Sequence, residues 1–214
     1  MEMTLQNKAK IIENYFNEIL PNACCELNYT KDYGFLIAVM LSAQCTDKKV
    51  NGVTSVLFKK FDTLEKLEQA SIIELEDILK PLGLYKAKAK HVKQIAHDLI
   101  YKFNKKVPTS KKDLMTLSGV GNKTSNVVRI ELFKIPEFPV DTHVFRVSKR
   151  LDLIEGNANV LDCENTLKSI FPKEHWILLH HQFIHFGRYY CKAINPKCDN
   201  CKLKGFCNYS KKEL

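Results

Sequence analysis

A lysine and an aspartate 18 positions apart are the residues best suited to covalent chemistry. Lys123 follows Gly119-Val120-Gly121, and Asp141 lies in the run Val140-Asp141-Thr142-His143. A lysine amine can act as a nucleophile, and a carboxylate can stabilise positive charge or move a proton. Each residue also has an ordinary explanation, because aspartate is a frequent helix N-cap and lysine side chains are mostly solvated.

The two glycines before Lys123 predict a hairpin between two helices. Ser110 and Asp113 have the spacing of a capping box, so a short helix is expected to begin there. Gly119 and Gly121 permit a tight turn, and a second helix is expected from about residue 122 until the prolines at 136 and 139. Backbone N–H groups at such a turn, beside the positive end of a helix, bind phosphate. The same glycine pattern also occurs as a simple turn.

Four cysteines near the C-terminus have the spacing of metal ligands. Cys191, Cys198, Cys201 and Cys207 form the pattern C-x6-C-x2-C-x5-C. Four thiolates this close suit a tetrahedral metal ion or an iron–sulfur cube. A structural zinc site usually offers two C-x-x-C pairs, and only one is present here. The spacing therefore favours [4Fe–4S] over zinc, with lysines decorating the loops between the ligands.

The charge of the chain favours a polyanionic partner. Its 214 residues contain 33 Lys and Arg against 24 Asp and Glu, a net charge of +9. Such a balance is typical of nucleic-acid-binding proteins, although some basic proteins have no such role. The polar N-terminus has no apolar signal segment, and the longest apolar run, residues 35–41, is too short to span a bilayer. We therefore expect a cytoplasmic protein without a membrane partner, in which eight cysteines do not form disulfides.

The hydrophobic pattern predicts an all-α protein. Apolar residues recur at helical spacing over residues 5–20 and along a long helix that ends near residue 103, and strand-type alternation is weak. Asp47 is expected to cap the helix that follows it. Leu82 and Leu84 are expected to be exposed in a loop. The lysines at positions 86, 88, 90 and 93 are expected to form a solvated helix face. Further helices are expected over residues 142–151, 160–170 and 174–190.

Taken together, these motifs resemble the endonuclease III family of helix-hairpin-helix (HhH-GPD) DNA glycosylases. The resemblance rests on L-S-G-V-G-N-K-T, V-D-T-H and the cysteine pattern, together with L-S-A-Q-C-T-D at 41–47 and L-G-L-Y at 82–85. It covers essentially the whole chain. It implies two all-α domains: a six-helix barrel with the helix-hairpin-helix over residues 25–135, and a domain of residues 1–24 and 136–214 that carries a [4Fe–4S] cluster loop.

The resemblance also implies an activity and a role for each motif. The enzyme would be a bifunctional DNA glycosylase and AP lyase that removes oxidised or ring-saturated pyrimidines from duplex DNA and cleaves abasic sites by β-elimination. Lys123 would be the nucleophile, its pKa lowered by the helix N-terminus and partial burial, and Asp141 would stabilise positive charge. The DNA-binding residues would be Gln44, Leu84, Gly119, Val120, Gly121 and His143. We expect a monomer associated with the nucleoid.

Two departures from the family pattern and two rival functions are relevant. Asn122 stands where the family usually has a basic residue, and Cys45 where alanine is common. The first rival is a monofunctional glycosylase that removes mispaired adenine or thymine, although such relatives generally lack the lysine found at position 123. The second is a non-catalytic DNA-binding module in which the iron–sulfur cluster is a scaffold.

Overall fold

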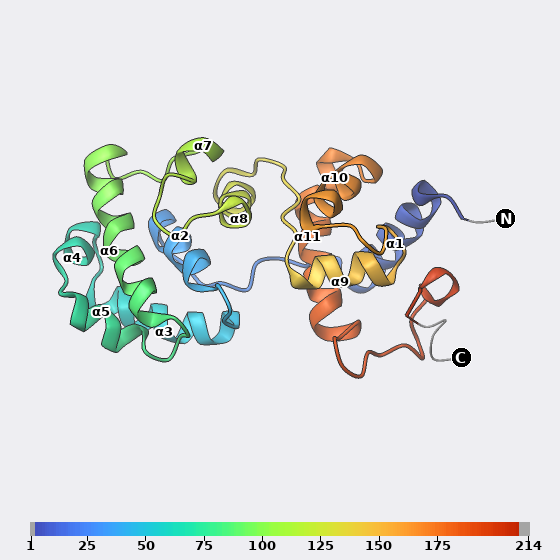
Figure 1. Cartoon of the computed structure of the whole chain (residues 1–214), viewed down its shortest axis with the longest axis horizontal. Coiled ribbons are helices and arrows are strands. Elements are labelled where there is room, and N and C mark those ends of the chain that lie inside the picture. The colour runs from blue at the N-terminus through green and yellow to red at the C-terminus, as the bar shows by residue number, and fades with distance from the viewer. Residues whose placement is uncertain (1–2, 210–214) are drawn as a thin grey trace. The chain divides into compact units, whose positions relative to one another are not determined.

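The regular structure of the chain is helical. The computed structural model describes residues 3–209, and all regular secondary structure within that range is helical (Figure 1). The expected all-α class is therefore confirmed. Among these described residues, no helix is long and apolar enough to cross a membrane.

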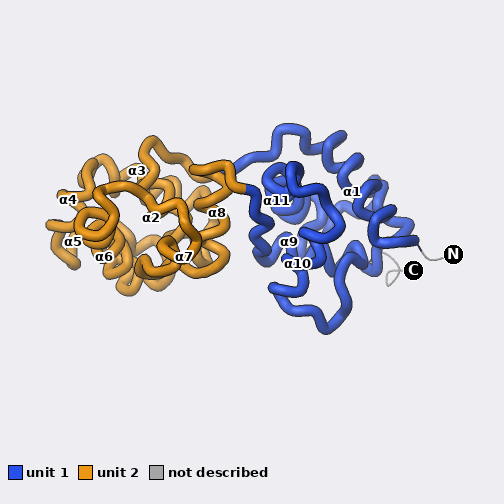
Figure 2. The backbone as a smooth tube through the Cα atoms, turned by 90° about the horizontal axis from the view of Figure 1, so that it is seen from above, with its two compact units in different colours: residues 1–25, 136–214 blue, residues 26–135 orange. Residues whose placement is uncertain are grey.

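The chain divides into two compact units (Figure 2). Unit 1 combines residues 1–25 with residues 136–214, and unit 2 is the continuous segment 26–135. Residues 1–2 and 210–214, which belong to the expected cluster domain, lie outside the described residues.

Unit 2 is built around a helix that is apolar on all sides. In α2 (Asp32–Leu41), every residue from Gly34 to Leu41 is buried. A helix with no polar face must be covered all round, and α2 packs against α3, α6 and α8, while α6 also packs against α4 and α5. The other helices of unit 2 are α3 (Asp47–Lys60), α4 (Leu64–Gln69), α5 (Ile72–Leu79), α6 (Tyr85–Lys102), α7 (Lys111–Leu114) and α8 (Asn122–Phe133).

Unit 1 has an aromatic core. Phe16, Phe138, Phe183 and Phe186 are fully buried and are linked by edge-on and tilted ring contacts. These rings join the first helix of the chain to helices from its last third. The elements of unit 1 are α1 (Leu5–Ile19), α9 (Thr142–Arg150), α10 (Val160–Ile170), η1 (Lys173–His175), α11 (Trp176–His185), the π-helical turn η2 (Phe186–Tyr190) and η3 (Lys204–Phe206).

Three details differ from the sequence-based expectations. Thr46, not Asp47, caps α3, because its side chain accepts the Lys49 N–H and Asp47 is already the first helical residue. Leu82 is buried, so only Leu84 of the two loop leucines is exposed. The helix expected over 174–190 is divided into a 3₁₀ turn, an α-helix and a π-helical turn.

Candidate active site

The glycine hairpin lies between α7 and α8 of unit 2. Leu117 and Val120 are buried and anchor its inner side, and the Val120 N–H donates to the Leu117 carbonyl at 3.1 Å. Gly119 between them has φ +75°, a left-handed conformation that glycine adopts at least cost. The predicted hairpin is therefore present, and it delivers the chain directly into α8.

The N-terminus of α8 is open to solvent. Its N-cap is Gly121, which has no side chain to accept the first N–H groups, and Gly121, Asn122 and Lys123 are all exposed. The first N–H groups of a helix have no partner within the helix, and they attract anions. Lys123 is in the first turn, but within unit 2 the partial burial expected for it is not found. The opposite side of α8 is anchored by the fully buried Ser125 and Asn126.

Asp141 opens α9 in unit 1 and is held by its own helix. Its Oδ1 accepts the backbone N–H groups of His143 and Val144, each at 2.8 Å, and its Oδ2 lies 2.9 Å from His143 Nδ1. The Asp141 side chain is 11% exposed, whereas that of His143 is 29% exposed. The helix cap therefore fixes the orientation of the carboxylate and pairs it with an accessible imidazole.

Gln44 and Leu84 share a backbone feature that sequence periodicity does not reveal. Both are exposed, and both have left-handed φ angles, 57° and 59°. Such angles are uncommon for residues with side chains and concentrate at functional sites.

Lys88 connects the loops that carry these two residues. Its Nζ donates to the Ala43 carbonyl at 2.9 Å and to Cys45 Sγ at 3.3 Å, and its backbone N–H donates to the Leu84 carbonyl at 3.0 Å. Lys88 is only 3% exposed, so its assignment to a solvated lysine face was wrong. Lys93, another lysine of that expected face, also departs from the assignment, because its Nζ donates to the carbonyls of Glu68 and Ala70 at 2.6 and 2.7 Å.

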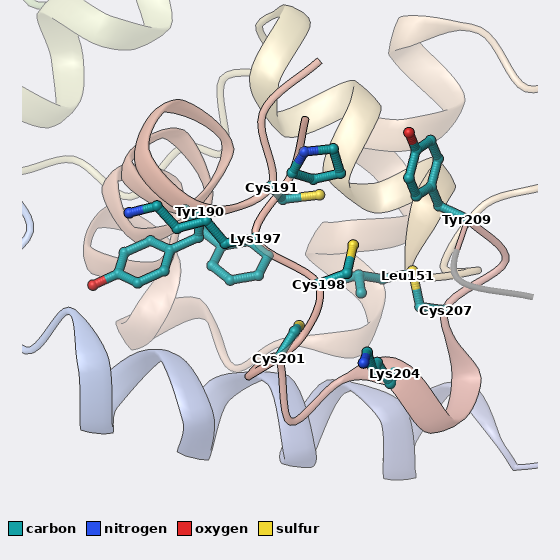
Figure 3. Close-up of a pocket in the computed structure, with 11 residues that line it drawn as sticks. Leu151, Tyr190, Cys191, Lys197, Cys198, Cys201, Lys204, Cys207 and Tyr209 are labelled. Atoms are coloured by element: carbon teal, nitrogen blue, oxygen red, sulfur yellow. The ribbon is translucent and has the colours of Figure 1, made fainter. Parts of the chain in front are cut away.

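The four C-terminal cysteines line one pocket in unit 1. Cys191, Cys198, Cys201 and Cys207 surround it with Leu151, Phe186, Tyr190 and Tyr209, and Figure 3 shows the sulfur atoms on the loop that follows η2. Burial raises the pKa of Cys201, and the neighbouring thiols Cys207, Cys191 and Cys198 raise it further. Four thiolates in this setting need a bound cation to balance their charge.

A single metal ion and a larger cluster require different spacings of four thiolates. Around a single zinc ion, four thiolates would lie about 3.8 Å from one another, given Zn–S bonds of about 2.3 Å. A cube binds each thiolate through a separate iron, so its ligands stand farther apart. The four thiols that share this pocket are a donor set that either centre can use, and the C-x6-C-x2-C-x5-C spacing favours the cluster.

Two arginines of α9 that sequence patterns did not single out hold the cysteine loop. Arg150 donates to the carbonyls of Lys192 and Ala193 at 2.6 and 3.1 Å and lies 3.4 Å from Cys191 Sγ. Arg146 donates to the carbonyls of Gly187 and Cys191 at 2.8 and 3.3 Å. The only sequence signal is their spacing of four, which places both on one face of the helix that begins at Asp141.

Gly187 allows η2 to approach α9 closely. A Cβ built on Gly187 would lie 2.9 Å from the Cβ of His143 and 3.3 Å from Nη2 of Arg146. A contact below 3.0 Å cannot be accommodated without a shift of the backbone, so only glycine fits here. The close approach brings the helix that begins with Asp141 and His143 against the turn that leads into Cys191.

Comparison with known proteins identifies the family of this chain. The model of the HhH-GPD superfamily of base excision DNA repair proteins matches residues 37–173. Endonuclease III of Bacillus subtilis is 42% identical over 195 residues, covering 91% of this chain and 89% of the relative. Endonuclease III of Escherichia coli is 36% identical over 208 residues, covering 96% and 98%. The chain therefore belongs to the HhH-GPD superfamily and, within it, to the endonuclease III family.

Solved structures support the same assignment. A trapped endonuclease III–DNA covalent intermediate superposes with a TM-score of 0.95 at 43% identity, covering 99% of both chains. A thermostable thymine-DNA glycosylase reaches 0.82 at 22% identity, a likeness that concerns the fold alone. Membership of the endonuclease III family makes this chain a DNA glycosylase and AP lyase of base excision repair.

Proposed function

We propose that the enzyme excises oxidised or ring-saturated pyrimidines from duplex DNA and cleaves the resulting abasic site through a Schiff base on Lys123. The observation that carries this proposal is the position of Lys123, an exposed amine in the first turn of α8 directly behind the glycine hairpin. The N–H groups of the hairpin and of the uncapped helix start would hold a backbone phosphate.

The reaction follows from the chemistry of an amine at C1′ of the damaged nucleotide. The damaged base must first leave the duplex stack, since its sugar cannot be reached inside it. The neutral Lys123 amine attacks C1′, and the base departs with the electron pair of the glycosidic bond. The nitrogen then loses a proton, and the C1′–O4′ bond breaks as O4′ takes up a proton, which opens the sugar ring and leaves an iminium. Removal of a C2′ proton expels the 3′ phosphate, which breaks the strand. Asp141 would stabilise the positive charge that develops on the sugar.

We propose that Gln44 and Leu84 fill the space left in the DNA stack. Leu84 is an exposed apolar side chain, 63% accessible, that precedes the first turn of α6. An apolar wedge between base pairs recovers contact area that the extruded base gives up. His143, beside Asp141, would contact the DNA backbone. The substrate is double-stranded DNA with a damaged pyrimidine or an abasic site, and one copy of the chain would act on one lesion.

We assign the cysteine pocket to a [4Fe–4S] cluster held by Cys191, Cys198, Cys201 and Cys207. Bound there, the cluster would fix the shape of the loop from 191 to 207 and present its lysines to DNA, and it has no step in the strand cleavage. Unit 1 would then be the cluster domain. Unit 2 would be the six-helix barrel, formed by α2 to α6 and α8, with α7 as the single-turn entrance to the hairpin.

Borohydride trapping on duplex DNA with one abasic site tests the proposal. Wild-type protein should give a covalent adduct, and Lys123→Ala should give none while it still binds the duplex. Lys112→Ala is the matched control, because Lys112 is also exposed and lies on the short helix before the hairpin. An adduct with Lys123→Ala would assign the nucleophile elsewhere. Tight binding without any wild-type adduct would favour the monofunctional enzyme or the binding module.

A further inference from the structure

The floor of the glycine hairpin contains a histidine that the proposed reaction does not use. His91 belongs to α6, and its Nδ1 lies 2.8 Å from the hydroxyl oxygen of Ser118. A Cβ built on Gly119 would lie 3.0 Å from His91 Cγ and 3.1 Å from its Cδ2. One half-buried ring therefore contacts two consecutive residues of the hairpin, by a hydrogen bond to the first and by direct packing on the second.

We propose that His91 is a positioning residue that sets the orientation of the hairpin for phosphate binding. This inference rests on the proposed function, since it assigns the rigidity of the hairpin to a contact made from a different helix. Leu117 and Val120 anchor the hairpin by burial, but apolar contacts are not directional. The hydrogen bond between His91 and Ser118 is directional. It therefore orients the backbone next to Gly119, whose left-handed conformation makes the turn.

The contact can persist whichever ring nitrogen carries the proton. A serine hydroxyl can donate to an unprotonated Nδ1 or accept from a protonated one. Met40 of α2 also approaches this residue, with its Cγ 3.2 Å from the Cβ built on Gly119, so α2 and α6 together support the turn.

The position of Lys123 is set independently of this contact. Helix α8 packs against α2 and buries Ser125, Asn126 and Val128. Loss of the His91 contact should loosen the hairpin and leave α8 in place. We therefore expect weaker binding of DNA with a nearly unchanged rate of the lyase reaction. A loss of overall folding would lower both.

The test measures binding and chemistry separately. Affinity is measured for a duplex that carries a tetrahydrofuran abasic analogue, which has no reactive C1′. Loss of one such hydrogen bond should weaken binding about two- to tenfold in Ser118→Ala. His91→Ala should weaken binding at least as much, because it also loses the packing on Gly119. For both variants, the single-turnover lyase rate at saturating enzyme should stay within about twofold of wild type.

A double-mutant cycle identifies the pair. Ser118→Ala combined with His91→Ala should bind no more weakly than His91→Ala alone, because both changes remove the same bond. His97→Ala is the control, since His97 is on the same helix but is exposed and lies 3.6 Å from Glu68. It should leave affinity unchanged. Ser118→Ala removes a single oxygen atom, so it keeps the test valid if His91→Ala unfolds.

Several results would overturn the inference. Wild-type affinity in Ser118→Ala and His91→Ala would show that the contact does not organise phosphate binding. Additive losses in the double variant would show that the two residues act separately. Borohydride trapping of these variants distinguishes this failure from failure of the proposed function: adducts with unchanged affinity refute only the role of His91, whereas a wild-type protein that neither binds nor traps the duplex refutes the proposed function.

Discussion

Replacing Asp141 with asparagine separates the two roles that the structure gives this residue. Its Oδ1 accepts two helix N–H groups at 2.8 Å, and an asparagine oxygen can accept the same bonds. The Asn variant therefore keeps the cap of α9 and loses the negative charge at the helix N-terminus, worth about 0.3–1 kcal/mol, together with the contact of the carboxylate Oδ2 with His143 Nδ1. Asp141→Ala also loses the cap, which adds about 1 kcal/mol. For a protein of this size, each kcal/mol lowers Tm by about 2–4 °C.

The effect on turnover should be much larger than the effect on stability. If the carboxylate stabilises positive charge on the sugar, its neutralisation should slow single-turnover excision about 100-fold or more, the order found when one preorganised electrostatic group is removed. Affinity for the abasic-analogue duplex should remain near that of wild type. The assay compares excision rate, affinity and Tm for wild type, Asn and Ala variants. An Asn variant that excises within threefold of wild type would refute the catalytic role and leave Asp141 as a helix cap.

Three further changes test other parts of the molecule. Leu84→Ala should slow excision from a damaged duplex more than cleavage at a pre-formed abasic site, and equal slowing in the two assays would remove its role as a wedge. The pure protein should be yellow-brown with broad visible absorbance that Cys198→Ser reduces or abolishes; a colourless wild-type protein with one zinc per chain would refute the cluster. Hydrogen bonds from Lys60 and Ser71 lower the pKa of Glu74 from 4.5 to about 2, so the stability they contribute is present above pH 4.5 and is lost as the pH falls towards 2. Glu74→Gln should weaken this acid dependence in a pH titration of unfolding, and an unchanged curve would contradict it.

Local sequence rules predicted the elements of the fold well. The apolar periodicity of residues 5–20 corresponds to α1, which ends one residue earlier, and the short helix expected to begin at Ser110 is α7, which Ser110 caps. The hairpin was predicted for a similar reason, because its glycines and the cap at Ser110 are short-range signals. All of these depend on contacts between residues at most a few positions apart.

Contacts between distant segments could not be predicted in the same way. Helical periodicity cannot tell that Lys88 meets the carbonyl of Ala43, 45 positions away, while Lys86 on the same helix is exposed. The contact of His91 with Ser118 spans 27 positions, and nothing in either local sequence predicts it. The capping error at Thr46 has a different cause: threonine and aspartate are both good N-caps, so adjacent candidates leave the helix start uncertain by one residue.

Lys88 gives a direct test of whether these distant contacts matter for function. A buried ammonium is costly unless it is hydrogen-bonded, and Lys88 places its charge against the loop that contains Gln44 while its backbone binds the carbonyl of Leu84. In Lys88→Met, the apolar stem is kept and the bond to Ala43 is lost, so we expect a loss of about 1.5–3 kcal/mol in stability. Excision from the duplex should fall more than the lyase rate at an abasic site, because the proposed insertion loop loosens and Lys123 is unchanged.

Lys86→Met is the matched control for Lys88→Met, since it removes the same charge from an exposed position of α6. If the two variants have the same Tm and the same excision rate, the bond from Lys88 to Ala43 adds nothing to stability or activity beyond the effect of removing one charge. The left-handed backbone at Gln44 is then maintained by its own loop. If only Lys88→Met is impaired, the strained conformation at Gln44 is maintained by one buried side chain, while the backbone bond to Leu84 is kept in both variants. The loop of Gln44 would then depend on a single amine, which explains why a lysine occupies a position where apolar packing alone would favour methionine.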